Sequence, residues 1–150
     1  MDALALVALV SRWLHLLAVA AAVGGAIFAR FVVAPAVDET LDDDQRDGLH
    51  AAVRRRWQIW VHGCIAVLLV TGGINLWRAM AGKPPASYMI VFGVKFALVL
   101  GVFLIAIMLT SRRAYLPTRR AAARAGTVLV VLAVAIILLS GVLRTLSLGA

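Results

Sequence analysis

Apolar residues fall into four long runs along the chain, separated by short polar stretches. The runs cover about residues 4–34, 57–78, 87–111 and 126–147. A helix needs about 20 apolar residues, at ~1.5 Å of rise each, to cross a hydrocarbon core ~30 Å thick. The pattern therefore predicts an all-α fold, a bundle of four transmembrane helices that forms a single integral membrane domain over residues 1–150.

Polar and aromatic residues mark where these runs end. Pro35 follows the first run and predicts that its helix closes at Ala34. Trp57 and Trp77 frame the second run, at the interfacial positions where membrane helices carry aromatic rings. The residues from Asp42 to Asp44 are placed to begin an amphipathic extension of the second helix, because carboxylates stabilise a helix N-terminus.

Composition agrees with a membrane protein and changes how the charge is interpreted. Hydrophobic residues make up 63% of the chain, charged residues only 15%, and the formal net charge is +8. With a mean hydropathy of +0.99, a soluble fold of this length would leave too much apolar surface in water. The basic residues lie mainly at the ends of the apolar runs, so the charge indicates helix orientation and excludes nucleic acid as a partner.

The positions of the arginines predict the orientation. The stretch between the third and fourth runs carries five arginines and no acid, and three more arginines, Arg54 to Arg56, precede the second run. Positively charged loops stay in the cytoplasm, so both stretches are predicted to be cytoplasmic. Both termini and the loop "AGKPPAS" then lie on the outer side, in an N-out/C-out topology.

The ionisable residues inside the runs share one level. Counted at ~1.5 Å per residue from Arg30, His15 lies about 22 Å above the inner surface. Thr71 also falls at about 22 Å, and Lys95, counted from Arg112, at about 25 Å. A charged side chain near the bilayer centre costs about 2.5–3.5 kcal/mol, so such groups usually mark function. The spacing predicts that His15 and Lys95 point into the bundle at one site in its outer half.

This outer level carries cations without carboxylates. Arg12 and Arg144 lie about 27 and 30 Å above the inner surface. All seven acidic residues lie at Asp2 or between residues 38 and 47. A buried cation without a counter-ion is costly. The missing anion is either a porphyrin, through its propionates, or a lipid phosphate that Arg12 and Arg144 reach by snorkelling.

Histidine and cysteine allow other interpretations. His15 is either a ligand or proton carrier, or a neutral histidine that donates to a neighbouring helix. His62 lies only about 9 Å above the inner surface, ~13 Å below His15, so the two are not axial ligands of one haem; interfacial packing is the interpretation that its depth favours. His62 and Cys64 point to different faces of their helix, so the spacing gives only a weak copper signal.

Three stretches combine these polar anchors. They are His15 followed by Gly25 and Arg30, the segment "RRRWQIWVHGCIAVLLVTGG", and the segment "YMIVFGVKFALVL", which contains Lys95. Together they resemble the first three helices of the CopD/HemJ-like group of small four-helix bacterial membrane proteins, over most of residues 12 to 111. The resemblance implies a multi-pass protein of the bacterial cytoplasmic (inner) membrane.

The resemblance also implies a cofactor and an activity. In the HemJ type, a protoporphyrinogen oxidase with haem b, a histidine of the first helix and a lysine of the third form the essential pair, which here falls on His15 and Lys95. His15 would then be the iron ligand, and Lys95, Arg12 and Arg144 would neutralise the propionates. Electron transfer or porphyrin oxidation would follow. The fourth run lacks that oxidase's Asn-Glu-x-Pro element, so whether the chain is an enzyme stays open.

A second class of function also stays open. The chain would then be a non-catalytic membrane subunit whose polar cluster binds lipid or a partner helix, and copper transport is a less favoured third interpretation. Glycine pairs at 24–25 and 72–73 give the small-residue faces that let helices pack closely. A homodimer or a place in a larger membrane complex is therefore compatible with the pattern.

Overall fold

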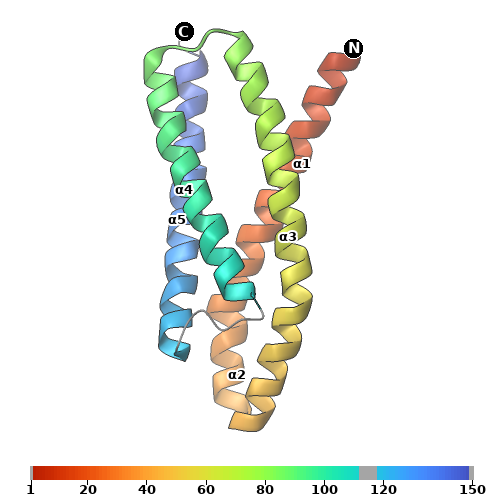
Figure 1. Cartoon of the computed structure of the whole chain (residues 1–150), viewed down its shortest axis with the longest axis vertical. Coiled ribbons are helices and arrows are strands. Elements are labelled where there is room, and N and C mark those ends of the chain that lie inside the picture. Colours follow the sequence, from red (N-terminus) through yellow and green to blue (C-terminus); the bar gives the residue numbers. More distant parts are fainter. Residues whose placement is uncertain (1, 112–117, 149–150) are drawn as a thin grey trace.

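A computed structural model describes residues 2–111 and 118–148, and these ranges are almost entirely helical. Within them, four helical stretches are long and apolar enough to cross a membrane, as predicted. Figure 1 shows them as a bundle made up of α1 (Ala3–Phe28), η1 (Ala29–Val33), α2 (Ala34–Thr40), α3 (Asp43–Ala81), α4 (Ala86–Thr110) and α5 (Arg119–Leu148).

Pro35 predicted that the first helix ends at Ala34, and this prediction is wrong. The first helical stretch continues to Thr40. The turn before the proline, η1, is π-helical, and the Ala34 N–H donates to the carbonyl of Ala29, five residues back. Pro35 has no N–H and its ring would crowd the carbonyl four residues back in a regular helix. The wider turn removes that conflict, so the proline is accommodated at the start of α2 and does not stop the helix.

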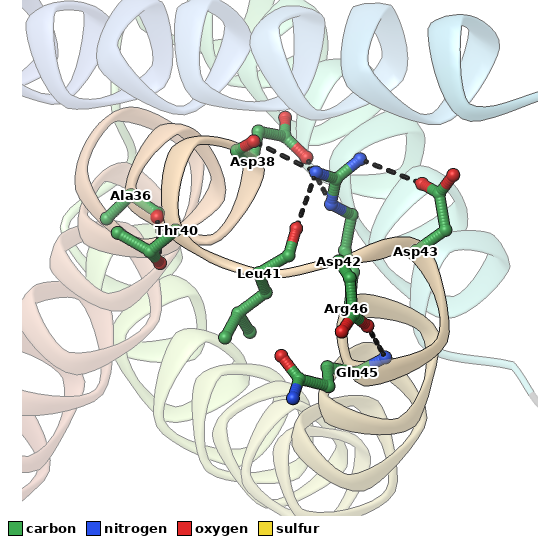
Figure 2. A network of polar contacts seen from close by, with 8 residues as sticks. All are labelled: Ala36, Asp38, Thr40, Leu41, Asp42, Asp43, Gln45 and Arg46. Atoms are coloured by element: carbon green, nitrogen blue, oxygen red, sulfur yellow. Dashed lines mark hydrogen bonds and ion pairs between the residues drawn. The ribbon is translucent and has the colours of Figure 1, made fainter.

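The acidic stretch begins α3 as predicted. The Asp42 side chain caps the helix by accepting from the Gln45 backbone N–H at 2.9 Å. Arg46 then ties the end of α2 to this cap: Figure 2 shows its guanidinium between Asp38, the Leu41 carbonyl and Asp43. The helix therefore starts well before Trp57, the residue at which the apolar run begins. The α5 helix likewise begins seven residues before the apolar run at Gly126.

The helices form two close pairs, α1 with α3 and α4 with α5, and contacts between α3 and α4 join the pairs. Small side chains such as Ala8, Ala18 and Ala133 fill much of the thin core, and no large side chain among the described residues is fully buried. Large apolar side chains cover the outside on every helix, which fits contact with lipid.

The bundle has two distinct ends. The start of α1, the connection from Gly82 to Pro85 and the end of α5 lie together at what we call the loop end (Figure 1). Arg30, α2 and the starts of α3 and α5 lie at the opposite, arginine-rich end.

Candidate functional site

A histidine on α1 is bonded to a threonine on α3. The Nδ1 atom of His15 lies 2.8 Å from the Thr71 hydroxyl oxygen. That hydroxyl also lies 2.6 Å from the Val67 carbonyl, which can only accept. Because a threonine hydroxyl has one hydrogen and gives it to the carbonyl, the imidazole must donate from Nδ1. The neutral ring then carries its free lone pair on Nε2.

Two further contacts join α1 to α3 beside this ring. Ser11, one turn before His15 on α1, donates to the Thr71 carbonyl at 3.4 Å, and both polar residues are buried. The imidazole lies against Gly72 of α3, because a Cβ built on this glycine would come within ordinary van der Waals contact of the ring carbon Cε1, at 3.6 Å. The first and second membrane helices therefore meet at a polar contact in an otherwise apolar interface.

Lys95 on α4 is a cation that acts on this pair. It is half-buried, and its charge acts electrostatically on the His15 ring. The charge of Lys95 thus reaches the His15 ring, and a shared site for the two residues stays a prediction. Within the described parts of the chain, Lys95 makes no hydrogen bond or ion pair. The arrangement is an imidazole that donates from Nδ1, together with a lysine that has no carboxylate partner among the described residues.

The other two predicted site residues, Arg12 and Arg144, are not part of this hydrogen-bonded contact. Arg12 on α1 and Arg144 on α5 have exposed side chains, and neither bonds to His15. Exposed arginines near the end of a span suit the snorkelling interpretation. The structure thus brings together His15 and Thr71, and it leaves Arg12 and Arg144 facing outward.

The remaining histidine and cysteine of α3 lie apart from the cluster. His62 is exposed and its Nδ1 lies 2.7 Å from the Gln58 carbonyl on its own helix. Cys64 is buried, so the two residues lie on different faces, as their spacing predicted. No group of three metal-binding side chains of the His, Cys, Asp and Glu types is found among the described residues.

The sequence did not predict which residues Thr71 and Arg30 contact. Thr71 shared the height of His15, and that agreement was the signal for their contact. In the sequence, Arg30 is a reference for heights and part of the family resemblance, yet its Nε donates to the Ala123 carbonyl at 3.2 Å and to the Thr127 hydroxyl at 3.1 Å, both on α5. Its guanidinium also lies 5.7 Å from the centre of the Phe31 ring. No periodicity in the sequence indicated that Arg30 joins two helices.

Comparisons of the chain with protein-family models, with curated proteins and with solved structures gave no match. A functional interpretation is therefore carried by the geometry around His15 and by the residues at which the sequence resembles a known group.

Proposed function

We propose that this chain is a membrane protein of the CopD/HemJ-like type that binds haem b or a porphyrin at His15 and acts in electron transfer or porphyrin oxidation. The observation that carries the proposal is the hydrogen bond from His15 Nδ1 to Thr71, which leaves Nε2 free to ligate. Histidines that bind metals almost always donate their other ring N–H to a protein group, which fixes the tautomer and the ring direction.

The charges around His15 also suit a haem or porphyrin with its propionates. Lys95 is half-buried and has no carboxylate partner among the described residues, so a propionate would supply the missing anion. In this proposal His15 holds the iron, Thr71 orients the ring and Lys95 supplies the counter-charge, together with Arg12 and Arg144 of the outer half. When bound, the haem supplies the one-electron chemistry.

The proposal includes a place and an orientation in the cell. The arginine-rich end is assigned to the cytoplasm of a bacterium by the positive-inside rule, with the chain in the inner membrane. The His15 cluster then lies in the outer half of the bilayer. The exposed apolar faces would admit a second copy or a larger membrane complex.

A non-catalytic subunit is the second candidate function. It is favoured by the thin core, in which no large described side chain is fully buried, because a partner helix could cover the remaining faces. In that case the cluster of His15, Thr71 and Lys95 would bind lipid or a polar group of the partner. The two candidates differ in one measurable property, the presence of a haem spectrum.

The deciding experiment uses protein purified from haem-sufficient cells. We expect a Soret band of the b type in the wild type and its loss in His15→Ala. His62→Ala is the matched control, because His62 is exposed and, among the described residues, its hydrogen bond is to a carbonyl of its own helix. Circular dichroism and size exclusion verify that each variant is folded. Colourless wild-type protein would contradict the proposal and favour the non-catalytic subunit.

A second pair of variants tests the lysine. Lys95→Met keeps the length of the side chain and removes its charge, so we expect weaker haem retention in a bundle that remains folded. Lys95→Arg retains the charge and should restore part of the retention. The haem content per chain, measured after extensive washing, is the readout. Full haem content in both His15→Ala and Lys95→Met would show that the site is wrongly assigned.

A further inference from the structure

A groove at the arginine-rich end has no role in the site around His15. It has a volume of about 520 Å³ and lies between η1 and the first turns of α5. Three arginines line it together with small and apolar side chains. The lining consists of Arg30, Arg120, Ala123, Arg124, Thr127 and Val128.

The charge of this groove is uncompensated. No ion pair joins any of its three arginines to a carboxylate in the described ranges, and none of its lining residues is acidic. Arg120 and Arg124 are four residues apart on α5, so they project from the same face of that helix. Arg30 faces this helix from the other wall. The three cations therefore surround one space and favour an anion there.

The Arg30 side chain is held in a way that suits an anionic oxygen ligand. Its Nε is bonded to the Ala123 carbonyl and the Thr127 hydroxyl, which fixes the direction of the guanidinium. Its two terminal nitrogens make no hydrogen bond to a described residue. A fixed guanidinium with free terminal N–H groups matches the paired oxygens of a phosphate.

The apolar side chains and the position of the groove indicate which kind of molecule contains that phosphate. Ala123 and Val128 make part of the wall apolar, and the membrane-spanning stretch of α5 runs from Arg120 to Thr145. The groove therefore lies where a helix leaves the hydrocarbon, at the level of lipid headgroups. Basic pockets between membrane helices at this level bind anionic lipid headgroups.

We infer that this groove is a binding site for an anionic phospholipid, whose phosphate contacts Arg30, Arg120 and Arg124 and whose acyl chain follows the apolar side of α5 past Val128. The inference depends neither on haem at His15 nor on which end of the bundle is cytoplasmic. It assigns a role to Arg30 of η1, which follows the end of α1 and is 15 residues beyond His15. The ligand would also join η1 to α5, a pair of elements with few direct contacts.

The test is made on the full chain in lipid nanodiscs. We expect phosphatidylglycerol to raise the midpoint of thermal unfolding above that in phosphatidylcholine, and native mass spectrometry to show phosphatidylglycerol retained on the protein. Arg124→Gln should weaken retention about fivefold, the usual effect of one basic residue near an anionic lipid surface. Arg56→Gln is the control, because Arg56 is also exposed, lies at the same end and is not part of the groove.

A second substitution separates charge from geometry. Arg30→Lys keeps the charge but removes the planar fork, so we expect it to weaken phosphatidylglycerol retention while Arg56→Gln leaves it unchanged. An equal loss in Arg56→Gln would indicate a general surface potential and overturn the inference. So would equal midpoints in the two lipids, or a stabilisation by inorganic phosphate as large as that by the lipid, which would show a site for a free anion. Haem content is recorded in parallel and is expected to be the same in all these variants.

Discussion

At the residue scale, a third group decides which side chain donates in the hydrogen bond between His15 and Thr71. The Val67 carbonyl takes the threonine hydrogen, so the threonine oxygen can only accept from the imidazole. One side chain on α3 thereby determines which nitrogen of a histidine on α1 has a free lone pair. The pair also brings a polar bond into an apolar interface, where it contributes about 0.6–1.7 kcal/mol to helix association.

Which ring nitrogen of His15 carries the hydrogen can be measured without any cofactor. In protein with ¹⁵N-labelled histidine, we expect the ring nitrogens of His15 to show the neutral form protonated at Nδ1. Thr71→Val keeps the shape of the side chain and removes the acceptor, so the signal should shift toward a mixture of the two neutral forms. Thr71→Ser retains the hydroxyl and is expected to restore the wild-type spectrum. A ring protonated at Nε2 in the wild type would contradict this assignment.

At the scale of helices, α1 and α3 pack closely where Gly25 meets the ring of Trp57. A Cβ built on Gly25 would overlap the ring of Trp57, whereas Gly24 beside it has no atom within 4 Å of such a Cβ. The glycine therefore lets the ring of Trp57 lie directly on the α1 backbone. This contact lies toward the arginine-rich end, on the same two helices that form the polar cluster.

The two adjacent glycines give a matched pair of variants. Gly25→Ala should lower the free energy of unfolding by about 1–3 kcal/mol, because the new methyl group overpacks against Trp57. Gly24→Ala adds the same group in open space, so its effect should be neutral or slightly stabilising. Thermal unfolding in detergent, followed by circular dichroism, measures both. Equal midpoints for the two variants would show that the Trp57 contact does not limit the approach of α1 and α3.

At the scale of the whole molecule, the bundle is two helix pairs with a thin shared core. The contacts of α3 with α4 hold the pairs together, and at the arginine-rich end Arg30 bonds to α5. The lipid-facing surface is almost entirely apolar on all four membrane-spanning stretches. Such a molecule needs a membrane or partner subunits around it, because water would meet long exposed rows of leucine, valine and phenylalanine.

The topology of the whole molecule is tested by cysteine labelling. In a Cys64→Ala background, single cysteines are placed at Ser87, near the loop end, and at Thr118, near the arginine-rich end. We expect an impermeant thiol reagent to label the first site in intact cells and the second only after the membrane is opened, because positively charged loops stay in the cytoplasm. Labelling of only the Thr118 site in intact cells would show the inverted orientation.

The sequence determined the class of the fold because apolar run length alone decides whether a helix can cross a bilayer. It also placed His15, Thr71 and Lys95 at one height, since the rise per residue of a helix is constant. The capped extension of α3 was equally local, because Asp42 bonds to a backbone N–H three residues away. These features depend on residues that are close in the sequence, so they can be predicted from the pattern along the chain.

The tertiary structure decided which side chains meet across helices. Height along a helix leaves its rotation free, so the sequence did not indicate that His15 donates to Thr71 or that Arg30 bonds to α5. The π-helical turn before Pro35 was hidden for the same reason: it changes the rotation of every following residue while leaving the apolar pattern intact. Contacts that depend on the rotation of two packed helices are set by how their surfaces fit, and only the folded bundle contains that information.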